Sequence, residues 1–426
     1  MKKMLLLMVL ALSVFMCSVQ KEEKKEENNA NGIPKKIVAG LDDSFVPMGF
    51  KNEKGEIVGF DIDLIKQIGK DLGYEIEKVE DGKITYIADE RGIVRSNLWL
   101  RTPDRILLKT DEFKALEFEE LFQRVKGYPW EELIPLDGEF TVTGVSVRSK
   151  LSSVPACQSV VKKAIVERLK DTYEVDRFEE TGAKYTVKVS ILKDIATITV
   201  DTTGQSLHKR GYRIAPVEAP IKETMAAALV LLSFWREDRI LVDPFCGSGT
   251  IPIEAAMIGL NIAPGLNRKF VSQEWHIIDE RLWKEEKRLA YEKINSEKRL
   301  EIYGFDISGK AIEAAIENAI EAGVAHIIRF KQLAVKDFKR LGDNGVIVTN
   351  PPYGKRIGKD RDIIGIYKDI NKFITENTDW SLFLITADEN AEYEIAGRKV
   401  DRRRKLFNGR IKTCYYQFHG KRLRKM

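Results

Sequence analysis

The sequence predicts an α/β fold, with a mostly parallel, doubly wound sheet in the second half of the chain and an α+β module before it. From about residue 220 onward, helical segments alternate with short apolar strands at residues 240–242, 300–306 and 346–348. This order is typical of parallel sheets, because a crossover must carry the chain back before the next parallel strand begins. Earlier, residues 184–204 alternate apolar and polar positions around Lys193-Asp194, which predicts a β-hairpin.

Length and composition indicate a globular protein of two or three domains. The chain has 426 residues, 43% apolar and 32% charged, which is ordinary for a protein with real cores. The net charge is +5, but residues 401–426 alone hold ten Lys or Arg and one acid. This basic end favours a polyanionic partner over a merely solubilising tail, and its interleaved aromatic residues favour a structured edge. The four Cys and four His are scattered, so we expect neither a disulfide framework nor a metal site.

The N-terminus is similar to a secretory signal. Residues 1–17, MKKMLLLMVLALSVFMC, combine a basic start with an apolar run too short to span a bilayer, and Cys17 stands where a lipoprotein cysteine would stand. A polar spacer completes this signal-like segment at residues 1–34. The other three cysteines are scattered and lack the spacing of a disulfide framework, which indicates a reducing compartment. We therefore expect a cytoplasmic protein, with a membrane-anchored lipoprotein as the alternative.

Residues 35–75 predict a strand, a hairpin around Lys54-Gly55 and an amphipathic helix from about Asp61. This stretch resembles the start of a bacterial amino-acid solute-binding lipoprotein, but the lobes that would enclose a ligand do not follow. We expect instead that its strand and helix complete a ferredoxin-like subdomain in the α+β module at residues 76–204. In that module, residues 80–108 predict two strands and a helix, and residues 149–170 predict a helix with a Ser-x-Pro start.

A glycine-rich turn follows the strand at residues 240–242. Asp243 ends the strand, Gly247 and Gly249 permit a tight turn, and Thr250 leads into a helix. Such a turn at the carboxyl edge of a parallel sheet is typical of a nucleotide-cofactor site. It is neither GxGxxG nor a P-loop, which argues against a dinucleotide and a nucleoside triphosphate. Asp306 ends the next strand, where its two oxygens could bind both hydroxyls of a ribose, although Asp is also a good helix cap.

The strand at residues 346–348 leads into Asn350-Pro351-Pro352-Tyr353. The two prolines have fixed φ angles and aim the backbone carbonyls rigidly. The Asn350 amide oxygen and one such carbonyl can each accept a hydrogen bond from a planar amino group, and Tyr353 offers a stacking face. The motif therefore predicts a pocket for a flipped nucleobase with an exocyclic amine, with a plain prolyl turn as the alternative.

Together, these motifs resemble those of THUMP-domain class I S-adenosylmethionine-dependent RNA methyltransferases, of the bacterial type that makes N2-methylguanosine in 23S ribosomal RNA. The resemblance begins at about Gly73 and rests on SKLSSVPACQSVVKKAIVERL, DTTGQSLHKRGYR, APIKETMAA, VDPFCGSGT, GFDIS and TNPPYG. It implies a THUMP/ferredoxin-like module at residues 76–204 and a Rossmann-like methyltransferase domain at residues 205–426. It also implies S-adenosylmethionine as cofactor and RNA, most of all ribosomal RNA, as partner.

The resemblance assigns roles to individual residues. Asn350, Pro351, Pro352 and Tyr353 would hold the target amine. The implied cofactor-binding residues are Thr224, Asp243, Phe245, Cys246, Gly247, Ser248, Gly249, Thr250, Asp306, Ile307 and Asp337. Of these, Ile307 would pack on the adenine, and Asp337 is the acid left to contact the adenine amine, because Ala334 stands where the family often has one. The implied RNA-binding residues are His208, Lys209, Arg210, Tyr212 and Arg213, with a basic linker as the alternative for this segment.

The expected activity is transfer of a methyl group from S-adenosylmethionine to the exocyclic N2 of a guanosine in RNA. Such a reaction needs positioning and polarisation of the amine more than a titrating base, which fits the absence of an evident His or Cys dyad. An amine methyltransferase acting on tRNA or DNA is the nearer alternative. A membrane-tethered solute-binding lipoprotein is the remote one.

Overall fold

The computed structural model describes residues 35–40, 49–51, 57–59, 75–80, 82–215, 220–352, 360–389, 391–396, 399–408 and 411–421. The signal-like segment 1–34, the helix predicted from Asp61 and the side chain of Tyr353 lie outside these residues. No helix of the described part is long and apolar enough to cross a membrane.

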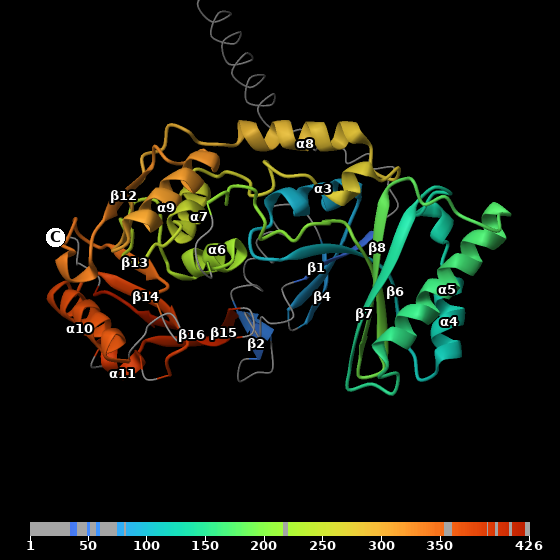
Figure 1. Cartoon of the computed structure of the whole chain (residues 1–426), viewed down its shortest axis with the longest axis horizontal. Coiled ribbons are helices and arrows are strands. Elements are labelled where there is room, and N and C mark those ends of the chain that lie inside the picture. Colours follow the sequence, from blue (N-terminus) through green and yellow to red (C-terminus); the bar gives the residue numbers. More distant parts are fainter. Residues whose placement is uncertain are drawn as a thin grey trace, which may run out of the picture. The chain divides into compact units, whose positions relative to one another are not determined.

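The first half of the described chain forms a seven-stranded sheet in the order β4-β5-β1-β6-β9-β8-β7 (Figure 1). Its strands are β1 (Lys35–Gly40), β4 (Glu75–Glu80), β5 (Lys83–Ala88), β6 (Arg105–Lys114), β7 (Glu139–Val147), β8 (Lys184–Leu192) and β9 (Ile195–Asp201). Its helices are α3 (Glu90–Trp99), α4 (Phe118–Lys126), the 3-10 turn η1 (Trp130–Glu132) and α5 (Val154–Tyr173). All neighbouring strands are antiparallel except β7 and β8. The predicted α+β module is therefore present.

Strand β1 lies inside this sheet and not at its edge. It pairs antiparallel with both β5 and β6, so that Ile37 stands opposite Tyr86 on one side and Leu108 on the other. The Ile37 side chain is fully buried. The strand predicted at the start of residues 35–75 therefore completes the module as expected. The predicted hairpin is present as β2 (Gly49–Lys51) paired with β3 (Ile57–Gly59).

Two local signals decide details of the module. Helix α5 begins at Val154, several residues after the predicted start, because Pro155 lacks an N–H and fits only in the first turn of a helix. The hairpin of β8 and β9 turns at Lys193 and Asp194, both with positive φ (51° and 66°). Two consecutive positive φ angles are typical of a type I′ turn, whose twist matches that of the two strands. Figure 1 shows α4 and α5 packed together against this sheet.

The second half forms a seven-stranded sheet in the order β12-β11-β10-β13-β14-β16-β15. Its strands are β10 (Leu241–Asp243), β11 (Ile302–Asp306), β12 (Ile328–Gln332), β13 (Val346–Thr349), β14 (Ser381–Thr386), β15 (Arg402–Asn408) and β16 (Ile411–Phe418). The first five are parallel, and β16 runs antiparallel to β14 and β15. The predicted mostly parallel sheet is thus confirmed. The described part of its basic last segment forms β15 and β16, and Tyr415, Tyr416 and Phe418 of β16 are almost wholly buried.

Helices cover both faces of this second sheet. The helices of this half of the chain are α6 (Glu223–Leu232), α7 (Thr250–Gly259), α8 (Glu280–Glu292), α9 (Gly309–Glu321), α10 (Asp360–Glu376) and α11 (Ala391–Ala396), with 3-10 turns η2 (Val271–Glu274) and η3 (Val335–Asp337). Of these, α8 and η2 pack against α3 and β8 of the first sheet and not on the second. Alternate strand residues enter different cores: Leu241 packs with α6 and α7, whereas Val242 packs with α10 and α11. The strand order reverses at β10, which lies between β11 and β13. Ligands of such sheets bind at the carboxyl ends of the strands beside this reversal.

Candidate active site

A pocket of about 480 Å³ opens at the carboxyl ends of β10, β11 and β13. This volume lies in the range typical of small-molecule sites. The pocket is lined by Pro244, Phe245, Gly247, Asp306, Ile307, Leu333, Ala334, Val335, Lys336, Asn350, Pro352, Ile366 and Asp369. Residues of all three predicted motifs therefore meet at one place, although more than 100 residues separate the first from the last.

The glycine-rich turn forms the floor of the pocket beside β10. Gly247 and Gly249 both have positive φ, at 52° and 79°, and Gly249 caps α7. A Cβ at Gly249 would lie only 3.0 Å from atoms of Ala315 and Phe330. Both the positive φ and the lack of space therefore require glycine at this position. Asn318 of α9 fixes the turn from behind by donating to the carbonyl of Ser248 at 3.1 Å.

Asn318 also joins this turn to the segment that precedes α6. Its side chain is fully buried, and its Oδ1 accepts hydrogen bonds from the backbone N–H groups of Ile214 (3.0 Å) and Ala215 (3.1 Å). One amide thus uses both its donor and its acceptor to hold two chain segments together. No motif in the sequence marks this residue, which sequence reasoning missed.

Asp306 lies at the mouth of the pocket, at the end of β11. Its Oδ2 accepts from the N–H of Gly247 at 3.0 Å, and its Oδ1 accepts from the N–H of Ser308 at 2.9 Å. Each oxygen keeps further acceptor capacity, because an ionised carboxylate offers about four lone-pair sites. Next to it, Ile307 is 72% exposed, which is unusual for a large apolar side chain. An acceptor pair beside an exposed apolar surface suits a ribose joined to a flat base.

Asp243 is buried behind the turn and braces it. Its Oδ1 accepts from the hydroxyl of Thr349 at 2.7 Å and from the N–H of Phe245 at 3.1 Å. Burial, which disfavours the charged form, raises the pKa of the Asp243 carboxyl to about 7, and the negative charge of Asp306 adds to the effect. The carboxyl thereby links β10 to β13. Cys246, Ser248 and Thr250 are likewise buried in the turn and do not line the pocket.

Asn350 provides the polar group on the opposite wall. Its Oδ1 atom is buried and accepts no hydrogen bond from any residue that the structure describes. A buried acceptor without a donor costs free energy of about 1–3 kcal/mol, so such atoms are rare unless a ligand supplies the donor. Pro352 lines the pocket beside it, and Pro351 is buried beneath.

The structure corrects the prediction for residues 207–213. Arg210 and Tyr212 are only 2% and 3% exposed, so the predicted direct contact of these two side chains with RNA is wrong. The Arg210 guanidinium donates to the carbonyls of Leu207 (2.9 Å) and Arg101, and lies 3.5 Å from Glu254. The Tyr212 hydroxyl donates to Glu254 at 3.1 Å. Both side chains are structural, because a buried guanidinium and phenol need these partners.

Two other predicted residues do not reach the pocket. The Thr224 hydroxyl is buried and donates to the Asp104 carboxylate at 2.9 Å, so it joins α6 to the residue that directly precedes β6. Asp337 ends η3 with its side chain exposed and does not line the pocket.

The remaining residues of the 207–213 segment differ in exposure. Arg213 donates to the Thr250 hydroxyl at 3.1 Å and is mostly covered. Lys209 is exposed and His208 half-buried. Of the predicted set, Lys209 is therefore the one exposed side chain, whereas the side chains of His208 and Arg213 are only 20% and 18% exposed.

Three families match the chain in order along its length. Residues 69–107 match the RlmL ferredoxin-like domain, residues 115–201 match the THUMP domain, and residues 210–417 match the RMKL-like methyltransferase domain. The first two matches fall on the first sheet and the third on the second sheet and its pocket.

Individual relatives agree with these matches. The chain is 50% identical over 366 residues to "Putative RNA methyltransferase YpsC" of Bacillus subtilis, which covers 85% of this chain and 94% of the relative. It is 33% identical over 353 residues to "Ribosomal RNA large subunit methyltransferase K/L" of Psychromonas ingrahamii, covering 80% of this chain but only 46%, about half, of that protein. The structure of SMU.472, "a putative methyltransferase complexed with SAH", superimposes with a TM-score of 0.82 at 40% identity and covers 92% of this chain and 99% of that one.

The pocket lies in the part of the chain that matches the methyltransferase domain. The match to the Bacillus subtilis relative, at 50% identity, spans 94% of that relative. The chain therefore belongs to the family of S-adenosylmethionine-dependent RNA methyltransferases that combine a THUMP domain with an RMKL-like methyltransferase domain.

Proposed function

We propose that this chain methylates the exocyclic N2 amine of a guanosine in ribosomal RNA, with S-adenosylmethionine as methyl donor. The observation that carries the proposal is the unpaired, buried Oδ1 of Asn350 at the pocket wall. An amine that donates to this atom recovers the free energy lost by leaving the acceptor buried without a partner. A guanosine amine bound in the pocket would thus supply the hydrogen-bond donor that Asn350 Oδ1 lacks.

The pocket fits the cofactor by its chemistry. Asp306 offers two carboxylate oxygens for ribose hydroxyls, Ile307 offers an apolar face for the adenine, and the glycine turn allows close approach of a ligand to the backbone. S-adenosylmethionine supplies an electrophilic methyl group when bound. Catalysis by the chain itself then consists of placing the amine and shaping its electron density.

Asn350 and the rigid backbone at Pro351 perform that task. The Asn350 Oδ1 would accept one N–H of the amine, and a backbone carbonyl of the rigid Pro351-Pro352 turn would accept the other. Two acceptors in one plane turn the nitrogen lone pair away from the ring and toward the methyl group. The nitrogen would form a bond to the methyl carbon while the sulfur–methyl bond of the cofactor breaks, so that S-adenosylhomocysteine leaves and the surplus amine proton passes to solvent. No residue has to change its own protonation state, so activity needs no titrating base.

The choice of ribosomal RNA and guanosine rests on sequence similarity. The K/L relative is named as a large-subunit ribosomal RNA methyltransferase, and the THUMP match supplies the RNA-binding module. The motifs quoted above resemble those of enzymes that make N2-methylguanosine. Structured RNA is recognised mostly through shape and phosphates, which suits a separate module beside the pocket. We place the reaction in the cytoplasm, where ribosomal RNA and the cofactor are present.

The decisive experiment is mass spectrometry of nucleosides in ribosomal RNA from cells with and without this gene. We expect N2-methylguanosine to fall in the deletion strain and to return when the gene is restored. Loss of a different methylated base, or a change confined to tRNA or DNA, would contradict the proposed substrate.

A purified-enzyme assay tests the role of Asn350. We expect Asn350→Ala to lower turnover on unmodified ribosomal RNA about 100-fold or more, as for removal of other transition-state hydrogen-bonding groups. Its affinity for S-adenosylhomocysteine should stay within about twofold, because the amine site lies apart from the ribose site. Asn295→Ala is the matched control, since Asn295 is exposed and its side chain lies outside the pocket. Turnover of Asn350→Ala equal to that of the control would refute the mechanism.

A further inference from the structure

We infer that Asp369 of α10 recognises the 6-amino group of the cofactor adenine. Asp369 lines the pocket and is half-buried, yet no described residue forms a hydrogen bond or an ion pair with its carboxylate. An ionised carboxylate that lines a ligand pocket without a protein partner keeps its full capacity to accept hydrogen bonds from a ligand. The pocket therefore contains a second acid besides Asp306, and the carboxylate of this acid, Asp369, can accept a hydrogen bond from a ligand.

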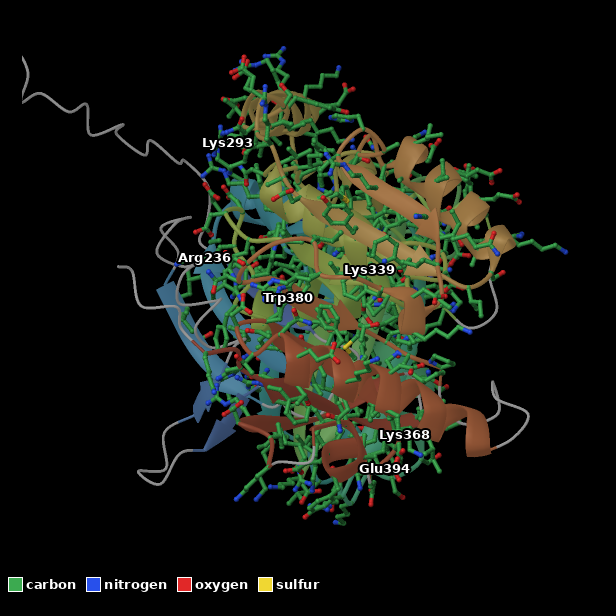
Figure 2. All side chains as sticks on the ribbon, turned by 90° about the vertical axis from the view of Figure 1, so that its left-hand side faces the viewer. Arg236, Lys293, Lys339, Lys368, Trp380 and Glu394 are labelled. Atoms are coloured by element: carbon green, nitrogen blue, oxygen red, sulfur yellow. The ribbon has the colours of Figure 1, made fainter. Side chains whose placement is uncertain are left out.

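The packing of α10 fixes where this acid lies. Phe338, which directly follows η3, contacts Phe373 of α10 with ring centroids 4.6 Å apart. Trp380, labelled in Figure 2, packs against both rings, with its centroid 6.0 Å from Phe338 and 5.2 Å from Phe373. Asp369 lies one turn before Phe373 on the same face of α10. The aromatic contact thus holds Asp369 beside η3, where Leu333, Ala334 and Val335 line the pocket.

The other side chains of α10 support this orientation. Ile366, three residues before Asp369, lines the same pocket. Tyr367 and Ile370 are almost fully buried against the sheet, and the intervening Lys368 is exposed at the surface (Figure 2). Among the α10 side chains that the structure describes, those of Ile366 and Asp369 line the pocket, and their spacing of three residues places them on one side of the helix.

The residues that line the pocket indicate that Asp369 contacts the adenine of the cofactor and not the amine that is methylated. The wall after β12 has three apolar residues and Lys336, which has only donors and cannot accept a hydrogen bond from an amine. Asp337 points to solvent and does not line the pocket. Asp306 already accepts from Gly247 and Ser308 at the ribose end. Among the described lining residues, Asp369 is the acid left for a purine amine between Ile307 and η3.

The chemistry makes the assignment selective. A carboxylate accepts a hydrogen bond from the 6-amino group of adenine and repels the 6-oxo group of hypoxanthine. An asparagine can do either, because its amide carries an acceptor and two donors. The inference rests on the cofactor site of the proposed function, but not on which base is methylated.

The test is calorimetric titration of the RNA-free enzyme with S-adenosylhomocysteine and S-inosylhomocysteine, which differ in the 6-amino or 6-oxo group and in the hydrogen that hypoxanthine carries on N1. We expect the wild type to bind the adenine compound at least about tenfold more tightly, since a hydrogen bond to a charged group is worth about 1.5–3 kcal/mol. Asp369→Asn should weaken S-adenosylhomocysteine about 10-fold and reduce the preference below about threefold. Glu376→Gln, an exposed acid-to-amide change on the same helix, should behave as wild type.

Equal binding of the two compounds by the wild type would overturn the inference, and that measurement needs no variant to fold. Asp369→Asn that keeps wild-type affinity but loses methylation would also overturn it, since the residue would then face the RNA base. Failure to find N2-methylguanosine would contradict the proposed function and leave the titrations unaffected. The two hypotheses can therefore fail separately.

Discussion

The buried carboxyl of Asp243 should make the stability of the ligand-free protein fall as the pH rises. Its pKa is raised from 3.8 to about 7 by burial. Below pH 3.8 both the folded and the unfolded chain hold the proton, and the group contributes nothing to the pH dependence. Above it, the unfolded chain loses the proton first, so each further pH unit favours the unfolded state until the folded carboxyl also ionises near pH 7.

The magnitude follows from the two pKa values. With 1.36 kcal/mol for each unit, the loss of unfolding free energy from this group is about 1.7 kcal/mol at pH 5 and about 4.3 kcal/mol at pH 8. The change between pH 5 and pH 8 is therefore about 2.6 kcal/mol. Asp243→Asn removes it while keeping both accepted bonds, because the amide oxygen can still accept from Thr349 and from the N–H of Phe245.

Urea unfolding of the wild type and Asp243→Asn, followed by fluorescence at pH 5 and pH 8, measures this difference. The variant should gain about 2.6 kcal/mol relative to the wild type between the two pH values. Asp176→Asn, at an exposed position, should run parallel to the wild type. If Asp243→Asn also runs parallel to the wild type, the carboxyl is already ionised in the folded protein and the reasoning is refuted.

Three further predictions test the fold and the corrected assignments. Ile37→Ala should lower the unfolding free energy by about 2–5 kcal/mol, whereas Ile320→Ala, at a 63% exposed position, should change it by less than about 0.5 kcal/mol; denaturant unfolding compares them. Asn318→Ala should lower it by about 2 kcal/mol or more and weaken S-adenosylhomocysteine binding, measured by calorimetry, because buried backbone groups lose their partners. Lys209→Ala should weaken RNA binding and flatten its salt dependence with unchanged thermal stability, whereas Arg210→Ala should lower thermal stability; the reverse pattern would contradict the burial argument.

The turns of the pocket could be predicted because their signals are local. A short apolar strand, an acid and two glycines specify a strand-turn-helix in consecutive residues, so Asp243, Gly247 and Gly249 fall where expected. The meeting of Asp306 and Asn350 at one edge follows from parallel strand order, which strand-helix alternation also indicates.

The partners of the buried polar groups could not be predicted, because they are distant in the sequence. Residues 207–213 contain three basic side chains, and no local pattern shows that Arg210 meets Glu254 and the carbonyl of Arg101. Asp369 stands in the middle of an ordinary amphipathic helix, and only the packing of Phe373 on Phe338 turns it toward the pocket. Such residues become visible once tertiary packing is known.

The place of β1 inside the first sheet constrains the order in which the chain can fold during synthesis. β1 is made first among the described strands, but both of its neighbours come later, the second ending at Lys114. The partner strand β5 ends at Ala88, but until Lys109, the last residue of β6 that pairs with β1, has left the ribosome, at least one edge of this apolar strand has no backbone partner. Non-local pairing of this kind is slow and leaves strand edges open to association with other chains. The interval between translation of Gly40 and Lys109 is thus a stage of synthesis at which the open edge of β1 favours association with other chains.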